Sequence, residues 1–203
     1  MTGSSPAAHH PPIICKLSSS LSSILTAHAI GPEKYCANPS GNALRASLGI
    51  PFDTLEENAA TKSATIFKLT ANDCFSEDTG LFVDALDGEP GVKSARYAGD
   101  IADNKANIEK LLLNLADNTN RKARFRTIIS LIKNGTVTEF EGICEGNILL
   151  QQTGENGFGY DAVFTPEGSE KSFAEMDIDE KNSYSHRKKA MAKLIAFLHQ
   201  NNY

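Results

Sequence analysis

Residues 74–99, CFSEDTGLFVDALDGEPGVKSARYAG, contain the pattern on which the fold and the site both depend. Two adjacent carboxylates, Glu77 and Asp78, stand at the end of a short predicted strand and are followed by Thr79 and Gly80. Buried ionised carboxylates lose their hydration, so two of them together need compensation. A divalent cation would supply it, since hard oxygen ligands suit Mg²⁺, and the glycine lets backbone approach a ligand. The alternative is a solvated acidic turn between two strands.

The composition indicates a soluble globular protein. The 203 residues suffice for one domain with a real core, and 40% hydrophobic and 22% charged residues are ordinary values. A formal net charge of -5 predicts no general surface for a nucleic-acid polymer, and no apolar run approaches the ~18 residues of a membrane span. The four cysteines are widely spaced without a C-x-x-C pair, which argues against a zinc site and a disulfide framework. We therefore expect a cytoplasmic protein.

Residues 1–50 differ from the rest of the chain. They are rich in serine and poor in acids, with Glu33 the first acidic residue. A targeting peptide is one interpretation, because Ala27-His28-Ala29 has the shape of a cleavage site. However, Lys16 is the only Lys or Arg before residue 34, which targeting peptides do not favour. We expect an atypical N-terminal segment that is poorly ordered or loosely packed, followed by one domain over residues 51–203.

From residue 51 onward the local signals agree with one another. Thr54-Leu55-Glu56-Glu57 matches a capping box and predicts a helix to about Leu69. Asp103 and Ser185 can cap two further helices, one through Leu115 and one at the C-terminal end. In the first helix we expect Ala59, Ala64 and Phe67 to face the core and Lys62 and Lys68 to face solvent; in the last, the predicted stripe is Met191, Leu194, Ile195 and Leu198.

The strand signals centre on Asn134-Gly135, a strong two-residue hairpin turn. Residues 123–132 predict the strand before it, and residues 136–150 the return, bent near Gly142 or Gly146. Strands mixed with helices, including one antiparallel hairpin, predict an α/β layered fold with a mixed sheet.

Four further residues or motifs could take part in binding or catalysis, and each also has a purely structural interpretation. Glu57 is either a metal ligand or only the carboxylate of the capping box. Phe158, between two glycines in Gly157-Phe158-Gly159-Tyr160-Asp161, either stacks on a base ring or fills the core. By default, Lys181 is interpreted as lying at a helix end that faces solvent. His186 and Arg187 begin a helix, where donors and the helix dipole favour anions or carbonyl oxygens.

Taken together, these pieces have a recognisable order and spacing. The motifs are SEDTGL, DGEPGVKSARYAG, N-x-x-K-L-L, ARFRT, FEG, GFGYD, FAE and SHR. The chain resembles the inosine triphosphate pyrophosphatase family, also called dITP/XTP pyrophosphatases, over about residues 51–198. The resemblance implies an ITPase-like fold over residues 51–203: a long mixed sheet flanked by helices, with two lobes and a central cleft. It also implies a homodimer.

The resemblance further implies a Mg²⁺-dependent hydrolase. Family members convert ITP, dITP and XTP to the monophosphate and pyrophosphate, which removes deaminated purines from the nucleotide pool. Matching the motifs residue by residue makes Asp78 the catalytic carboxylate and a metal ligand, and Glu57 a second metal ligand. The matched substrate-binding positions are Thr79, Phe158, Gly159, Tyr160, Asp161, Lys181, His186 and Arg187. Glu77 stands where relatives usually have aspartate, and either it or Asp78 could accept the proton of the attacking water.

Base selection would depend on the six-position of the purine. Hypoxanthine and xanthine present an acceptor oxygen there, while adenine presents an amino donor. Donors from His186 and Arg187 would pair with the oxygen and would be left unpaired by adenine, which is costly in a closed site.

The N-terminal part departs from the family pattern. Relatives have a T-x-N-x-x-K loop that grips the triphosphate; Ser40-Gly41-Asn42 resembles its start, but Arg45 falls one residue short of the lysine. We hypothesise that residues 15–50 are not the family's N-terminal unit, through a shifted reading frame or alternative splicing. The alternative function is then a catalytically impaired nucleotide-binding remnant. A third interpretation is a phosphatase acting on other phosphate esters.

Overall fold

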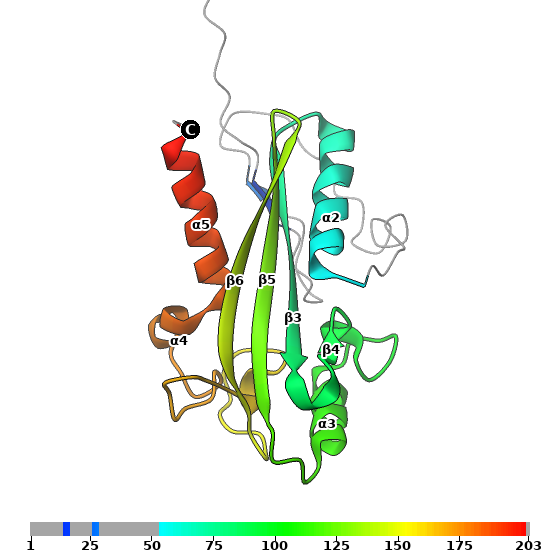
Figure 1. The fold of residues 1–203 in the computed structure, drawn as a ribbon, viewed down its shortest axis with the longest axis vertical. Helices are drawn as coiled ribbons and strands as arrows, with labels where there is room; N and C mark the ends of the chain where they lie inside the picture. Colours follow the sequence, from blue (N-terminus) through cyan, green and yellow to red (C-terminus); the bar gives the residue numbers. More distant parts are fainter. Residues whose placement is uncertain (1–13, 17–25, 29–52, 202–203) are drawn as a thin grey trace, which may run out of the picture.

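The computed structural model describes residues 14–16, 26–28 and 53–201 (Figure 1). The expectation that residues 1–50 are poorly ordered therefore falls mostly outside the described residues. The helices and strands are, in chain order, β1 (Ile14–Lys16), β2 (Thr26–His28), α2 (Leu55–Thr70), β3 (Cys74–Val83), β4 (Pro90–Gly91), α3 (Asn104–Leu115), β5 (Lys122–Lys133), β6 (Thr136–Ile148), β7 (Phe164–Pro166), α4 (Ile178–Tyr184) and α5 (His186–Gln200).

One sheet organises residues 53–201. Its strand order is β4-β3-β5-β6-β7, and Figure 1 shows the long strands β3, β5 and β6 running the length of the molecule with helices on both sides. Asn134 and Gly135, both with positive φ, form the predicted turn between β5 and β6. The α/β prediction is confirmed. Every pairing among the described strands of this sheet is antiparallel, including that of β3 with β5, whose connection contains α3.

β3 is one unbroken strand, which corrects the predicted turn at Thr79 and Gly80. It pairs with β5 along its whole length, from Cys74 opposite Ile132 to Val83 opposite Ala123. The backbone groups of the acidic stretch are therefore used in the ladder, and no turn forms there. Successive side chains of a strand point to opposite faces. The two adjacent carboxylates must consequently serve different sides of the sheet.

The two sides are covered by different helices. On the α2 face, Cys74 and Ile132 pack with Ile66 of α2. On the opposite face, here called the α5 face, strand residues pack against Ala190 and Leu194 of α5. Figure 1 shows α2 and α5 flanking the strands on either side. The residue numbers on β3 alternate accordingly, with even positions on the α2 face and odd positions on the α5 face.

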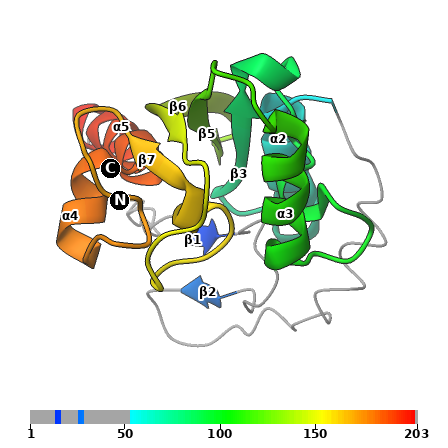
Figure 2. The same cartoon turned by 90° about the horizontal axis from the view of Figure 1, so that it is seen from below.

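The largest core lies toward the other end of the long strands. It joins odd-numbered residues of β3 to α3 and to the segment around β7, with members Leu81, Val83, Tyr97, Ile108, Leu111, Leu115, Ala123, Phe125, Cys144, Ile148, Tyr160, Val163, Phe164, Phe173 and Met176. Figure 2, seen from below, shows α3 beside β3 and β7 beside β6. The α5 face thus carries two cores, one under α5 and one under α3.

The helix boundaries agree with the capping signals. Thr54 caps α2, Asp103 caps α3 and Ser185 caps α5, each through a side-chain oxygen that accepts from a backbone N–H of the first turn. The predicted faces are less accurate. Ala64 and Ile195 are exposed, and the α2 side chains that are buried are Leu55, Ala59, Ser63 and Ile66. The apolar stripe of α2 was misassigned because serine, a polar residue, occupies one of its core positions.

Candidate active site

A pocket of about 460 Å³ lies on the α5 face, between the start of α5 and the start of α3. β3 and β5 form its floor through Thr79, Leu81 and Phe125. All eight residues predicted to bind substrate line it: Thr79, Phe158, Gly159, Tyr160, Asp161, Lys181, His186 and Arg187. They come from a strand, a loop and two helices, so the fold brings together what the sequence keeps apart.

The loop around Phe158 is held by a buried carboxylate. Asp161 is only 6% exposed, and its Oδ2 accepts from the Phe158 amide at 2.8 Å and from Lys181 Nζ at 2.6 Å. A Cβ at Gly157, which has φ +81°, would meet that same oxygen at 2.3 Å. The loop therefore presents Phe158 with half of its surface exposed. Phe158 does not fill the core, and its ring is free to pack against a ligand.

Lys181 is not a solvated helix end. Besides its ion pair with Asp161, its ammonium group lies 5.6 Å from the ring centre of Phe158 and 5.2 Å from that of Phe173. Lys181 belongs to the short helix α4, which Asp177 caps by accepting from the Glu180 amide. The lysine thus links α4 to the Phe158 loop at the pocket wall.

Tyr160 and Thr79 close the pocket on the strand side. Tyr160 is buried, and its hydroxyl donates to the Ser94 carbonyl at 2.9 Å; burial raises the pKa of this phenol. The Thr79 hydroxyl shares a hydrogen bond of 2.7 Å with the Thr127 hydroxyl of β5. Both side chains are thereby fixed before any ligand arrives.

His186 is buried and stacks on Phe125, with ring centres 4.8 Å apart and planes at 11°. Burial, aided by the cations Arg187, Lys181 and Lys189, lowers the pKa of His186 to about 3. Its Nδ1 is buried without a hydrogen-bond partner. The imidazole is therefore neutral at physiological pH and keeps an unused polar atom at the pocket.

Gly142 of β6 allows the start of α5 to approach the sheet closely. A Cβ at this position would lie 2.0 Å from the His186 carbonyl oxygen and 2.5 Å from the Ala190 amide. β6 runs past both Gly142 and Gly146 as one strand that is paired with β5 residue for residue. These glycines admit other backbones, since Gly146 is similarly close to Thr165. Gly142 thus sets the position of the helix end that carries His186 and Arg187.

Arg187 pairs with Glu77 across the α5 face. Its Nε lies 3.4 Å from Glu77 Oε1, and its Cζ lies 5.5 Å from the ring centre of Phe158. Glu77 is only 2% exposed. This pair accounts for the first of the two adjacent carboxylates.

Asp78, the second carboxylate, points to the α2 face. Its Oδ1 accepts from Lys62 Nζ at 2.5 Å, and Asn58 of the same helix also donates to its side chain. Desolvation by burial raises the pKa of Asp78, opposed chiefly by Lys62. Lys62 was predicted to face solvent, which is wrong. The signal that could have found it is its place one helical turn after Asn58, on the face toward β3.

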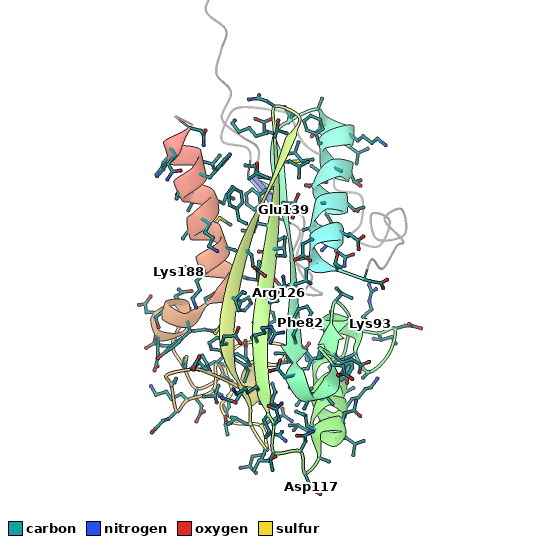
Figure 3. The ribbon with its side chains drawn as sticks, in the orientation of Figure 1. Phe82, Lys93, Asp117, Arg126, Glu139 and Lys188 are labelled. Atoms are coloured by element: carbon teal, nitrogen blue, oxygen red, sulfur yellow. The ribbon has the colours of Figure 1, made fainter. Side chains whose placement is uncertain are left out.

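Glu57 lies in the first turn of the same helix and bonds the capping residue Thr54. Its backbone amide donates to Thr54 Oγ1 at 3.2 Å, and its Oε2 accepts from the Thr54 hydroxyl at 2.9 Å. Its neighbour Glu56 pairs with Arg126 at 2.9 Å. Arg126 also bonds Glu141 and lies over the Phe82 ring; Figure 3 shows Arg126 and Phe82 near the middle of the sheet. The first turn of α2 is thereby anchored to the strands.

A family model describing the Ham1 family matches residues 47–197. The chain belongs to the Ham1 family. This confirms the family resemblance and its extent as predicted from the motifs. Among relatives of this Ham1-family chain, the dITP/XTP pyrophosphatase of Christiangramia forsetii is 51% identical over 146 residues, covering 72% of this chain and 77% of the relative. That of Flavobacterium johnsoniae is 48% identical and covers 72% and 76%.

Solved structures support the same assignment. The Ham1 protein of Staphylococcus aureus superposes with a TM-score of 0.72 at 41% identity, covering 74% of this chain and 79% of that one. The nucleoside-triphosphatase / dITP/XTP pyrophosphatase of Mycobacterium abscessus gives 0.65 at 39% identity, with coverage of 71% and 79%. A Ham1-type nucleotide hydrolase is therefore the class to which this chain belongs. In the part of the chain that the structure describes, no helix has the length and hydropathy needed to cross a bilayer.

Proposed function

We propose that this Ham1-family chain hydrolyses ITP, dITP and XTP to the monophosphate and pyrophosphate. The observation that carries the proposal is the pocket, in which a half-exposed aromatic ring faces a fixed set of donors. Relatives about half identical to this chain are named dITP/XTP pyrophosphatases, which agrees with that chemistry.

Phe158 would stack on the purine ring, a contact worth about 1–3 kcal/mol per base in comparable sites. Arg187 has only donors, and the neutral His186 has one donor and one acceptor. A six-oxo purine satisfies these donors, whereas the adenine amino group would leave one buried and unpaired. Tyr160 and Thr79 would define the remaining walls, and the Asp161–Lys181 pair would hold the loop in place.

Asp78 and Glu57 would hold Mg²⁺ together with phosphate oxygens. Among the described residues, no three His, Cys, Asp or Glu side chains are grouped as a complete metal site. Such a group is not required, because Mg²⁺ in nucleotide enzymes is commonly bound through one or two carboxylates, the substrate phosphates and water. The donor set fits this pattern: Asp78 is a buried carboxylate on β3, and Glu57 is exposed near the start of the helix that contacts it. The ion would supply charge neutralisation at the phosphates.

Asp78 would also take the proton of the attacking water. Lys62 would keep the Asp78 carboxylate in a fixed position for this step. The pocket opens on the α5 face and Asp78 points to the α2 face. β4 pairs with β3 at Leu81 and Phe82, and β1 also lies against β3. Thr79 lines the pocket, so a triphosphate bound at Thr79 would lie one residue along β3 from Asp78.

A nucleotide-binding remnant is the second candidate. It is favoured by the lack of a recognisable phosphate-gripping loop before residue 51. In that case the chain binds IMP and does not hydrolyse ITP.

The cytoplasmic location and the homodimer are further parts of this proposal. They are supported by the family resemblance and by the free nucleotide substrate. Sedimentation of the purified chain tests the dimer, and cell fractionation tests the location.

The deciding experiment measures pyrophosphate release from ITP, XTP and ATP with Mg²⁺, and again with EDTA. We expect turnover of ITP and XTP that far exceeds turnover of ATP and that is lost with EDTA. Asp78→Asn should lower kcat about 10³-fold, as expected for loss of a general base. Asp73→Asn is the matched control, because Asp73 also pairs with a lysine, Lys133, at 3.0 Å but lies at the far end of β3. Release of orthophosphate instead of pyrophosphate would establish a phosphatase, and IMP binding without turnover would establish the remnant.

A further inference from the structure

Glu77 forms an ion pair with Arg187, which lines the pocket, although Glu77 itself is not one of the lining residues. Glu77 is 2% exposed, and the arginine side chain is 25% exposed. The facing atoms, Glu77 Oε1 and Arg187 Nε, are each buried and form no hydrogen bond of good geometry with any group. Each is thus compensated mainly by the charge of the other at 3.4 Å.

Packing alone does not account for an ion pair at this position. A carboxylate this deeply buried has a large desolvation penalty, which only a close opposite charge offsets. Replacing both partners by apolar residues is often no worse for stability, so the pair itself is weak evidence for a stabilising role. What it does provide is a fixed orientation, because a guanidinium is planar and its donors have a rigid arrangement.

The surroundings of Arg187 leave it little freedom. Glu77 lies at Nε, and the Phe158 ring lies at 5.5 Å from Cζ. Gly142 brings the backbone of α5 against β6, so the helix start cannot shift toward the sheet. Arg187 and His186 both line the pocket, and the Nδ1 of His186 has no hydrogen-bond partner among the described residues.

We propose that Glu77 is a positioning residue that holds Arg187 for recognition of the six-oxo purine. The adjacent carboxylates then have different roles. Asp78 acts at the phosphates from the α2 face, and Glu77 supports recognition of the base from the α5 face. Glu77 does not act as the general base, because its carboxylate points to the opposite side of the strand. This inference rests on the proposed base recognition and deepens it.

The test measures binding of IMP and of AMP by calorimetry, because monophosphates report on the base pocket without any need for turnover. We expect wild-type protein to prefer IMP. Glu77→Gln should lower the affinity for IMP about tenfold, as expected when an arginine–base contact loses its alignment, and should change AMP binding little. Glu77→Asp should restore most of the preference, because the charge returns. Glu141→Gln is the matched control, since Glu141 also bonds an arginine, Arg126, but lies away from the pocket.

A double-mutant comparison distinguishes the proposed positioning of Arg187 by Glu77 from a merely structural role of Glu77. In an Arg187→Ala background, Glu77→Gln should change the IMP:AMP preference no further, because Glu77 acts through Arg187. If Glu77→Gln fails to fold, Glu77→Asp and the double variant carry the test. A wild-type preference for IMP that Glu77→Gln leaves intact overturns the inference. A wild-type protein with no preference for IMP overturns the proposed base recognition instead, so the two failures are distinguishable.

Discussion

The two faces of the sheet contact their helices through different sets of side chains. On the α2 face, apolar contacts such as that of Ile66 with Cys74 and Ile132 are joined by buried hydroxyl groups. Ser63 and Ser130 share a hydrogen bond of 2.9 Å, and Ser76 donates to the Ala59 carbonyl at 2.5 Å. On the α5 face the contact is apolar, with Phe75, Ile129, Leu131, Phe140, Ala190 and Leu194. Both faces present a buried carboxylate of β3 to a cation of the covering helix.

The difference shows how each carboxylate is placed. Hydrogen bonds between small side chains are directional, so they fix the position of α2 along β3 and bring Lys62 to Asp78. Apolar contact is non-directional and leaves the position of α5 less defined. On that face, the position of α5 is fixed by the close approach at Gly142 and by the Glu77–Arg187 pair.

The largest effect is expected from truncating the apolar contact. Leu194→Ala should lower the free energy of unfolding by about 3.5 kcal/mol, because Leu194 is fully buried and the cavity cannot collapse completely. Ile195→Ala, on the same helix but 45% exposed, should change it by less than about 0.5 kcal/mol. Denaturant unfolding measures both. Equal effects would contradict the assignment of the buried face of α5.

The next largest effect comes from filling the space between β6 and α5. Gly142→Ala should cost about 2.5 kcal/mol, because the added Cβ would meet backbone atoms that cannot rotate away. It should also weaken IMP binding by displacing His186 and Arg187. Gly99→Ala is the control, since nothing lies within 4 Å of its Cβ position. Unchanged stability in Gly142→Ala would mean that α5 is not held closely at this point.

The pH dependence of the free energy of unfolding reports on the buried imidazole of His186 on the α5 face. Burial lowers the pKa of His186 to about 3, so the unfolded chain binds a proton below pH 6.5 while the folded chain does not. Stability therefore falls as the pH falls through this window, by about 2 kcal/mol between pH 8 and pH 5 for this residue alone. His186→Gln should lose that part of the dependence in unfolding measurements at both pH values. Parallel curves for the two proteins would show that His186 takes up a proton in the folded chain as readily as in the unfolded chain.

The smallest effect is expected on the α2 face. Ser130→Ala should cost about 1 kcal/mol, because Ser63 keeps its hydrogen bond to the Ala60 carbonyl and loses only one partner. The double variant Ser63→Ala/Ser130→Ala should cost little more than the single one, since no buried hydroxyl is then left unpaired. A strongly additive double variant, measured by denaturant unfolding, would show that the two hydroxyls do not act as a pair.

Much of the fold was predictable because its signals are local. Thr54, Asp103 and Ser185 each cap a helix through amides within the next few residues, and Asn134-Gly135 adopts the positive φ values that a tight turn needs. Such interactions involve neighbours in the chain, so their residue types indicate them directly. The buried faces were harder to predict, since Ser63 occupies a core position of α2 without being apolar.

The candidate site was partly predictable. The motif GFGYD and the residues Lys181, His186 and Arg187 pointed to a nucleotide pocket, and the fold brings them to its walls. Lys62 was missed because its partner, Asp78, lies on a different element. Gly142 was interpreted as a bend, because a sequence does not reveal which backbone will approach a glycine.

The sequence by itself determined the helix starts, the hairpin and the presence of two adjacent carboxylates near a set of nucleotide-binding motifs. It also determined that Glu77 and Asp78 point in opposite directions once they lie in a strand. Only the tertiary structure decided which helix covers each face, and hence that Asp78 meets Lys62 while Glu77 meets Arg187. The physical reason is that local hydrogen bonding and steric preference are properties of neighbouring residues. The partner of a buried charge, in contrast, depends on how distant segments pack.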